Sequence, residues 1–386
     1  MRTAFVSSYP PRRCGIATYT QALGAATGER VVVALQPPDQ ELPFPFEVAL
    51  RIRRDELADH LRAAQTLNGR VDVVSIQHDF GIWGGDDGSN VLDFVGALDV
   101  PAVATLHVIP ADPSVRQRAI LTRLMDSVAT TVVMCRPAAT LLTECYGADA
   151  RRIEVIHHGV PDLPLVDPAK IKPTLGLAGR HVILGFGLLG PTKGFELVIE
   201  ALPTVVEADP SACFVVLGAT RPDLAREDGE RYRDGLLARV RDLGLGDHVR
   251  FIDRFAGRVE LTRWLEAADI FVTPYTDREQ VVSGTLSYAM GAGRAIVSTP
   301  FAYALDLLSD GRGVVLADDS PTALAAALGD LLADSERRGV MGRRAYEHSR
   351  AMVWPEIGAA FRRVLSRVAA ESAISAPAAR LTSARV

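Results

Sequence analysis

Cysteine is scarce in this chain and too widely spaced to form a metal or disulfide motif. The 386 residues include four cysteines, at positions 14, 135, 145 and 213, and no Cys-x-x-Cys pair. This spacing argues against zinc knuckles and disulfide frameworks, and unpaired cysteines are typical of the reducing cytosol. We expect no metal and no other cofactor.

Long apolar runs are also missing. The opening residues 1–6 are too short an apolar stretch for a signal peptide and are interpreted as a first strand. No run approaches the roughly 20 residues that a membrane-spanning helix needs. We expect a cytoplasmic protein, with peripheral contact at the inner membrane face if its substrate is lipid-linked.

An excess of positive charge is absent as well. The net charge is -5, so no global basic field indicates nucleic acid as a partner. The cluster Arg51–Arg54 is a local exception, and it is either a solvated face or a contact with an anionic membrane. The oligomeric state stays open.

What the chain does have is an alternation of apolar strands and helices that occurs twice. Alternation of this kind predicts parallel sheets, and its repetition predicts two Rossmann-like doubly wound α/β domains facing across a cleft. The strands are predicted over residues 3–7, 30–35, 47–51, 71–77, 102–106, 129–134 and 153–156, and then over 181–186, 213–217, 249–252, 270–273 and 295–298.

Composition sets the expected domain boundaries. Residues 1–160 form the first domain, and residues 161–180, with four prolines and no apolar period, are predicted to be a linker. Residues 181–352 form the second domain, and residues 353–369 a last helix with Pro355 in its first turn. The Ala-, Ser- and Arg-rich residues 370–386 are predicted to be a disordered tail.

The stretch 269–293 is the most informative in the chain. An apolar strand ends at Pro274, a loop follows, and Ser283-Gly284-Thr285 then opens a helix with a good N-cap residue. A helix N-terminus suits an anionic group such as a diphosphate. The alternative is an ordinary capped helix.

The first predicted strand of each domain is followed by a turn that contains glycine and basic residues. Arg12, Arg13 and Gly15 come after the strand 3–7, and Gly187 and Lys193-Gly194 come after the strand 181–186. A cation beside glycine in such a turn suits a phosphate, although neither turn has the spacing of a P-loop. A plain strand-to-helix connection with an exposed lysine is the alternative.

Two histidines stand where buried strands end. His78 and His107 follow neighbouring strands at the edge where α/β sheets place ligand loops. His107 is either a structural hydrogen bonder or a functional group. Asp86 and Asp87 are interpreted as helix caps rather than metal ligands.

These features occur in the order seen in the retaining glycosyltransferases of family 4, which have the GT-B fold, and the chain resembles that family from about Arg2 to Val368. Its Gln-x-x-Ser-Gly-x-Leu pattern resembles that of a mannosyltransferase-like branch of the family. The matching motifs are Pro11-Arg-Arg-Cys-Gly15, Val-Ala-Thr-Leu-His107, Ile156-His-His-Gly-Val160, Lys193-Gly194, Ala292-Gly-Arg-Ala-Ile-Val-Ser-Thr299 and Trp354-Pro-Glu-Ile357.

The resemblance implies a nucleotide-sugar site in the second domain, an acceptor site in the first, and a last helix that crosses back to the first domain. It implies that Lys193 holds the diphosphate, that His107 lies beside the transferred sugar, and that Arg254 and Phe255 flank the base. The implied donor-binding residues are Gly15, Gly187, Lys193, Arg254, Phe255, Gln280, Ser283, Gly284, Thr285 and Tyr288; the catalytic ones are His107, Lys193 and Glu279; the acceptor-binding ones are Arg13 and His78.

The chain departs from the family in the sugar and ribose contacts. Relatives carry two glutamates at the positions of Gln280 and Tyr288, and Glu279 lies one residue before the first of these positions. Leu188 stands where relatives often have an arginine. A tyrosine cannot accept two ribose hydrogen bonds as a carboxylate does.

The expected reaction is transfer of a hexose, with mannose favoured, from a nucleoside diphosphate sugar to a hydroxyl of a glycan, lipid-linked or small-molecule acceptor, as in polysaccharide biosynthesis. Retention by same-face attack is preferred, and a double displacement stays open. The alternatives are a glycoside phosphorylase on the same fold and a non-catalytic sugar- or nucleotide-binding protein.

Overall fold

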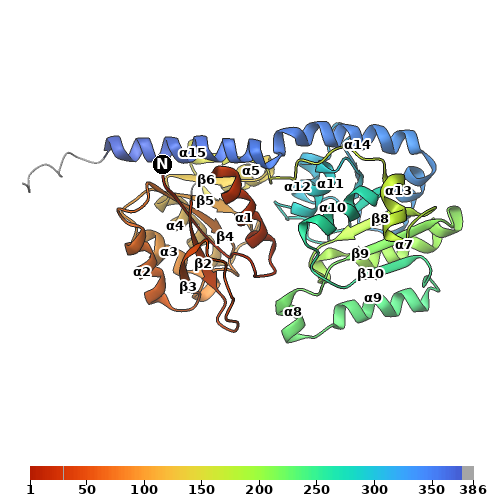
Figure 1. Ribbon diagram of the computed structural model, residues 1–386, viewed down its shortest axis with the longest axis horizontal. Coiled ribbons are helices and arrows are strands. Elements are labelled where there is room, and N and C mark those ends of the chain that lie inside the picture. The colour runs from red at the N-terminus through yellow and green to blue at the C-terminus, as the bar shows by residue number, and fades with distance from the viewer. Residues whose placement is uncertain (29, 376–386) are drawn as a thin grey trace, which may run out of the picture. The chain divides into compact units, whose positions relative to one another are not determined.

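The computed structural model describes residues 1–28 and 30–375, which fold into two compact units (Figure 1). Unit 1 comprises Met1–Gly159 together with the helix that begins at Trp354, and unit 2 comprises Val160–Val353. Each unit is built on its own parallel sheet, in agreement with the twofold alternation of the sequence.

Unit 1 contains a seven-stranded sheet in the order β3-β2-β1-β4-β5-β6-β7, in which every pairing is parallel. Its strands are β1 Thr3–Ser7, β2 Arg30–Gln36, β3 Val48–Arg53, β4 Val73–His78, β5 Ala102–Leu106, β6 Thr130–Val133 and β7 Ile153–Val155. Its α-helices are α1 Gly15–Thr27, α2 Leu57–Leu67, α3 Asn90–Gly96, α4 Val115–Ser127, α5 Arg136–Tyr146 and α15 Trp354–Ser375, and its short 3-10 turns are η1 Asp86–Gly88 and η2 Ala150–Arg152.

Unit 2 contains a six-stranded parallel sheet in the order β10-β9-β8-β11-β12-β13. Its strands are β8 His181–Phe186, β9 Ala212–Leu217, β10 Val249–Ile252, β11 Ile270–Thr273, β12 Ala295–Ser298 and β13 Val314–Val315. Its α-helices are α6 Pro168–Ile171, α7 Phe195–Ala208, α8 Pro222–Glu227, α9 Arg231–Asp242, α10 Arg258–Ala267, α11 Gly284–Gly291, α12 Ala302–Leu307, α13 Pro321–Ala333 and α14 Ser335–Ser349, and its 3-10 turns are η3 Lys172–Leu175, η4 Pro191–Lys193 and η5 Arg350–Met352.

Several strands of both sheets are completely buried, because helices cover both faces of each sheet. The residues of β4, β5, β9, β11 and β12 are buried along their whole length, as expected when helices pack on both faces of a parallel sheet. In unit 2, α7 and α9 lie on one side of the sheet and α10 and α11 on the other (Figure 1). The hydrophobic core of unit 2 includes Phe195 of α7, Phe214 of β9 and Leu328 of α13, which pack between the sheet and helices such as α7, α9 and α13.

Each strand order reverses beside the first strand of its unit. In unit 1 the reversal lies between β1 and β4, and in unit 2 between β8 and β11. Ligands of doubly wound proteins bind at the carboxyl ends of the strands at such a switch point. The loops after β8 and β11 are therefore the first place to look for a ligand site in unit 2.

The segment predicted to be a linker, residues 161–180, is folded onto unit 2. Pro168 and Pro173 begin short helical turns, α6 and η3, because proline is well tolerated in the first turn of a helix. Lys172 in this segment is buried and forms an ion pair with Asp269, with Nζ 2.6 Å from Oδ2. A proline count is thus a poor guide to whether a segment packs.

The predicted disordered tail begins too early. Residues 370–375 continue α15, which packs along α1 of unit 1, and Phe361 and Leu365 on this helix are fully buried. The Gly358 backbone approaches the carbonyl oxygen of Ala26 so closely that a Cβ would collide with it. The remaining residues of that prediction, 376–386, lie outside the described residues.

Candidate functional site

The loop after β8 meets the loop after β11 at a point where only glycine fits. Gly194 has a φ of 63°, and a Cβ there would collide with the carbonyl oxygen of Pro274. The backbone N–H of Thr276 also donates to the carbonyl of Thr192, at 3.3 Å. These contacts join the two loops beside the switch point and place Lys193 at their junction.

Lys193 extends over an aromatic ring. Its Nζ lies 4.0 Å from the centroid of the Tyr275 ring, within the range of a cation–π interaction. Burial alone would raise the pKa of Tyr275, but the charge of Lys193 and the hydrogen bonds made by the Tyr275 hydroxyl outweigh it and lower that pKa. The ammonium group is therefore held in position by the protein itself.

A row of hydroxyl groups leads from this ring to the start of α11. The Tyr275 hydroxyl lies 2.6 Å from Oγ1 of Thr285, which lies 3.1 Å from Oγ of Ser283. Ser283 also caps the helix, since its Oγ accepts from the N–H of Leu286 at 3.2 Å. The sequence-based expectation of a Ser283 cap is confirmed.

The same cluster brings together several of the residues expected to bind the donor. A Cβ at Gly187 would lie 3.5 Å from Cγ2 of Thr285 and 3.9 Å from Nζ of Lys193. Gly187, Lys193 and Thr285 are thus neighbours, with Gly284 at the first residue of α11. An ammonium, two hydroxyls and a helix N-terminus suit a ligand with a concentrated negative charge.

The loop between β11 and α11 carries the other predicted residues of this site. Gln280 uses its amide to donate to the carbonyl of Val282 at 2.7 Å, so this side chain stabilises its own loop. Glu279 is exposed, with its N–H bonded to the carboxylate of Asp277. Tyr288 is half-buried one turn into α11.

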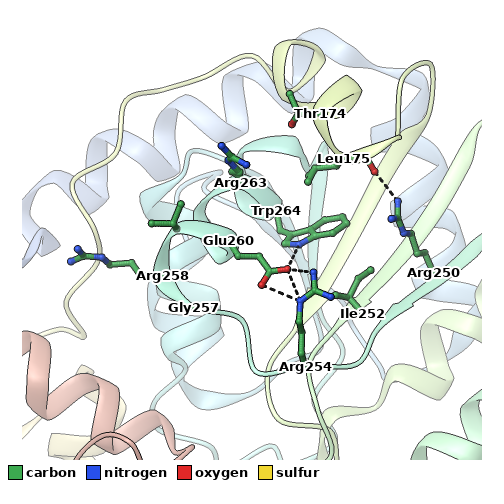
Figure 2. Close-up of a pocket in the computed structure, with 11 residues that line it drawn as sticks. Thr174, Leu175, Arg250, Ile252, Arg254, Gly257, Arg258, Glu260, Arg263 and Trp264 are labelled. Carbon is green, nitrogen blue, oxygen red and sulfur yellow. Dashed lines mark hydrogen bonds and ion pairs between the residues drawn. The ribbon is translucent and has the colours of Figure 1, made fainter. Parts of the chain in front are cut away.

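Arg254 and Phe255 lie on a different loop, after β10. Arg254 is one of the residues that line a cavity of about 990 Å³ between η3, β10 and α10 (Figure 2). There its Nε donates to both carboxylate oxygens of Glu260, at 2.9 and 3.2 Å. Phe255 is 39% exposed and does not line this cavity.

In unit 1, His107 is anchored by a glutamine. Its Nε2 donates to Oε1 of Gln77 at 2.9 Å, and its ring packs edge-on against Tyr19 of α1, with centroids 5.1 Å apart. Burial lowers the pKa of His107 to about 3, with smaller contributions from His158 and His78. His107 is therefore a neutral imidazole, and Gln77 fixes the tautomer that leaves Nδ1 with the lone pair.

Of the two residues expected to bind the acceptor, His78 lies beside His107 and is buried, whereas Arg13 is exposed. The backbone N–H of His107 donates to the carbonyl of His78, but the His78 side chain is fully buried and both its ring nitrogens lack a hydrogen-bond partner. Arg13 is exposed, and Gly15 is the first residue of α1. Gly15 has open space around it and needs no special backbone conformation.

Two residues of these clusters are absent from the sequence-based predictions. Gln77 is the penultimate residue of β4, just before His78, and Tyr275 directly follows the proline that ends β11. Both positions are the carboxyl ends of strands beside a switch point, which is the signal that could have identified them.

Residues 1–28 and 30–375 contain no group of three or more His, Cys, Asp or Glu side chains arranged to hold a metal ion. Within the same ranges, no helix is both long and apolar enough to cross a bilayer.

Comparison with protein families finds a match in each half of the chain. The model of glycosyltransferase family 4 matches residues 14–162, and the model of glycosyl transferases group 1 matches residues 180–334.

Among curated proteins, the chain is similar to the D-inositol 3-phosphate glycosyltransferase of Corynebacterium efficiens. The two are 28% identical over 275 residues, which cover 66% of this chain and 63% of that one. The chain spans 51% to 63% of the length of three curated relatives that it matches.

Two solved structures show the same fold. Sucrose-phosphate synthase from Thermosynechococcus elongatus superposes with a TM-score of 0.79 and 17% identity, covering 96% of this chain and 100% of that one. Anabaena HepE in complex with UDP gives a TM-score of 0.78 and 16% identity, covering 95% and 100%. The expected GT-B fold, with two parallel-sheet α/β domains, is confirmed.

Proposed function

Because the chain carries a glycosyltransferase family 4 domain followed by a glycosyltransferase group 1 domain, we propose that it transfers a hexose from a nucleoside diphosphate sugar to a hydroxyl acceptor, with retention at the anomeric carbon. The donor diphosphate binds unit 2 beside Lys193 and the N-terminus of α11. The acceptor is a glycan, a lipid-linked glycan or a small molecule.

One observation carries the proposal: the Lys193 ammonium and the Ser283–Thr285 hydroxyls gather at a helix N-terminus beside the switch point. Glycosyl transfer separates an oxocarbenium-like sugar from a diphosphate that gains negative charge. Preorganised cations and N–H groups lower the barrier by stabilising that charge. Lys193 and α11 can do this without a metal ion, so we propose that none is required.

The roles of the other predicted residues are part of the same proposal. His107 is the imidazole that hydrogen-bonds the transferred sugar; its lowered pKa supports this role, because a neutral ring can accept as well as donate. Gly187 and Gly284 leave room for phosphate oxygens, and Gln280 and Tyr288 contact the sugar and ribose. Glu279 lies on the donor loop and is exposed, so we favour same-face attack over a carboxylate nucleophile.

The sugar and base follow from the resemblance alone. The Gln-x-x-Ser-Gly-x-Leu pattern, present as Gln280 to Leu286, supports mannose and thus GDP-mannose as donor. The curated relative above is named for D-inositol 3-phosphate, and solved structures of HepE are titled for complexes with UDP and with UDP-glucose. These names make D-inositol 3-phosphate and UDP-glucose the other substrates to test.

The proposal is tested with UDP-, GDP-, ADP- and dTDP-sugars and a panel of hydroxyl acceptors. We expect nucleoside diphosphate release that depends on the acceptor and persists with a metal chelator, and an NMR spectrum of the product with the donor's anomeric configuration. Turnover that requires inorganic phosphate and no nucleotide would instead identify a phosphorylase. Nucleotide binding without turnover on any donor would identify a non-catalytic binding protein and reject transfer.

A further inference from the structure

The cavity between η3, β10 and α10 is separate from the Lys193 cluster. It is lined by η3, by β10 and the loop after it, and by α10 as far as Trp264, and neither Lys193 nor any residue of α11 lines it. Its volume of about 990 Å³ falls within the range of small-molecule sites. Of its lining residues, Arg254 alone belongs to the expected donor-binding set, and it is paired with Glu260.

Positive charge is concentrated at this cavity in a protein of net charge -5. Its lining contains four arginines and a single carboxylate, that of Glu260. The hydrogen bond from Arg254 lowers the pKa of Glu260, so this carboxylate stays ionised and neutralises Arg254. Three guanidinium groups remain uncompensated.

Two of these groups are directed at the cavity. Arg250 donates from Nη1 to the carbonyl of Leu175 at 2.8 Å, and its Cζ lies 5.6 Å from the Trp264 ring centroid, so this guanidinium is fixed in place. Arg263 forms no ion pair with any residue in the described part of the chain. Figure 2 shows Arg250, Arg254 and Arg263 around the Trp264 ring, with Arg258 directed away from it.

The chemistry of this lining selects an oxyanion. A guanidinium stays charged at every physiological pH, and its planar fork matches the oxygens of a phosphate. The first turn of α10 also faces the cavity, and its N-cap, Gly257, has no side chain to satisfy the N–H groups there. Leu175 and Ile252 add an apolar wall that can contact an organic group attached to the phosphate.

We propose that this cavity is a second anion site, which binds a phosphate-bearing ligand through Arg263 and Arg250 independently of the donor site. The phosphate belongs either to a free phosphorylated compound or to the headgroup of an anionic lipid. These two sources share the chemistry and are separated by experiment.

The test measures two probes on the full chain. Calorimetry with inorganic pyrophosphate reports a free ligand, and flotation with phosphatidylglycerol vesicles against phosphatidylcholine vesicles reports a lipid headgroup. The variant is Arg263→Gln, because this exposed side chain can be changed without disturbing the fold. Loss of one charge-assisted contact is expected to weaken binding of the responding probe about tenfold.

Two controls isolate the site. Arg343→Gln removes an exposed arginine of α14, outside the cavity, and should leave binding unchanged. Because pyrophosphate can also bind beside Lys193, its calorimetry is carried out on the Lys193→Ala background, where the binding that remains reports the cavity. The proposal is overturned if neither probe binds, if Arg263→Gln binds both probes like the unmodified chain, or if only Lys193→Ala abolishes binding.

Discussion

At the scale of single residues, Lys193 is the side chain on which the proposed reaction depends most. Replacing it with alanine removes a preorganised cation at the developing diphosphate charge. Lys193→Ala should therefore cost about 2–4 kcal/mol of transition-state stabilisation, or roughly 30- to 900-fold in turnover. Steady-state kinetics at saturating donor measure this loss.

The matched control for that experiment is Tyr275→Phe. It keeps the ring beneath the ammonium and removes the hydroxyl that bonds Thr285. We expect a smaller loss of turnover than in Lys193→Ala. Unchanged turnover in Lys193→Ala would exclude this lysine from the chemistry.

Gln77 is a positioning residue for His107. Gln77→Leu removes the acceptor of the Nε2–H bond while keeping a side chain of similar size, so the ring loses its fixed tautomer. We expect turnover to fall about tenfold, the cost of one buried hydrogen bond, with little change in nucleotide affinity. Imidazole ¹⁵N shifts, which distinguish the two tautomers, should show a mixture in the variant.

A second substitution separates positioning from packing. In Gln77→Glu the hydrogen bond survives, but a carboxylate beside His107 favours the imidazolium and should raise the pKa of the ring. An imidazole that stays in one tautomer in Gln77→Leu would show that packing against Tyr19 alone orients the ring.

The sequence identifies the charged and glycine residues of the unit 2 cluster but not their aromatic support. Lys193, Ser283 and Thr285 stand out because a cation beside glycine and a capped helix are local patterns. Tyr275 does not stand out, because its role depends on the loop after β8 lying against the loop after β11. Gln77 is hidden for the same reason, since its partner His107 lies on a neighbouring strand.

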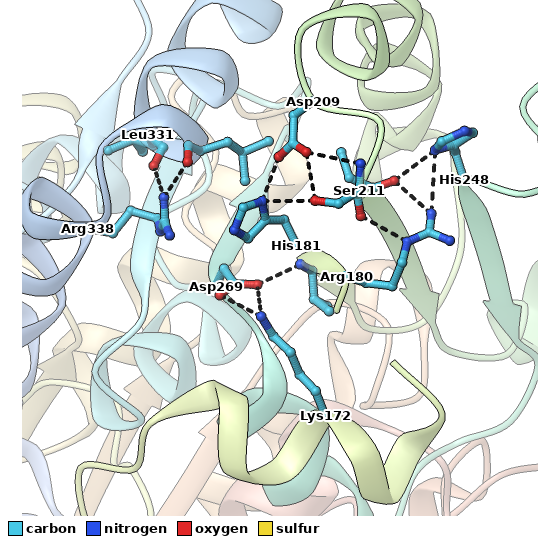
Figure 3. A network of polar contacts seen from close by, with 12 residues as sticks. Lys172, Arg180, His181, Asp209, Ser211, His248, Asp269, Leu331 and Arg338 are labelled. Atoms are coloured by element: carbon cyan, nitrogen blue, oxygen red, sulfur yellow. Dashed lines mark hydrogen bonds and ion pairs between the residues drawn. The ribbon is translucent and has the colours of Figure 1, made fainter. Parts of the chain in front are cut away.

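At the scale of elements, the ion pair between Lys172 and Asp269 fastens the 161–180 segment to the sheet (Figure 3). Both side chains are 10% exposed, and Asp269 also accepts from the backbone N–H of Val182. Lys172→Met leaves a buried carboxylate without its cation, which should lower the free energy of unfolding by about 3–5 kcal/mol. Urea denaturation measures the change.

Lys170→Met is the control for this ion pair. Lys170 lies on the preceding turn, is exposed and is not paired with any described residue, so its replacement should change stability by less than about 0.5 kcal/mol. Equal effects of the two substitutions would mean that the ion pair contributes nothing to holding the segment.

Gly194 is where the loop after β8 contacts the loop after β11, and its replacement should disrupt both loops. A non-glycine residue at its φ of 63° is strained by about 1–3 kcal/mol, and the Cβ would also collide with Pro274. Gly194→Ala should therefore lower the urea midpoint and weaken nucleotide binding. Gly329→Ala, within α13 and with open space around it, should instead stabilise the protein by roughly 0.5–1 kcal/mol.

If Gly194→Ala left both the urea midpoint and nucleotide affinity unchanged, the two loops would be free to move apart. In that case the position of Lys193 would not depend on their contact.

At the scale of the whole molecule, the two units should differ in their response to acid. Burial lowers the pKa of His78 and of His158 to about 4, and that of His107 to about 3, and all three lie in unit 1. An unfolded chain takes up protons at these positions near pH 6.5. Stability that is present above pH 6.5 should therefore be lost as the pH falls towards 4.

The expected slope is up to about 1.4 kcal/mol per pH unit for each histidine. The tryptophans are Trp83 and Trp354 in unit 1 and Trp264 in unit 2, so a Trp264→Phe variant reports unit 1 by fluorescence. Urea unfolding of this variant at pH 7.5 and at pH 5 should show the loss. Adding His78→Phe should reduce it, and equal stability at both pH values would contradict the neutral state of these rings.

The sequence predicts the overall architecture well because each doubly wound half repeats a strong local pattern of buried strands and amphipathic helices. It fails where an outcome depends on distant contacts. The prolines at 168 and 173 indicate a linker, but Lys172 between them pairs with the distant Asp269, which in turn accepts from the N–H of Val182. The composition of residues 370–375 indicates disorder, but these residues continue α15, which packs along α1.

The connectivity of α15 has a consequence for biosynthesis. Unit 2 is one uninterrupted stretch, so a ribosome releases all of it before Trp354 emerges, and its sheet and helices can close at once. Unit 1 emerges first but finishes last, since the groove beside α1 stays unfilled until Phe361 and Leu365 arrive. Its exposed apolar surface must be tolerated, or shielded by chaperones, for as long as translation of unit 2 takes.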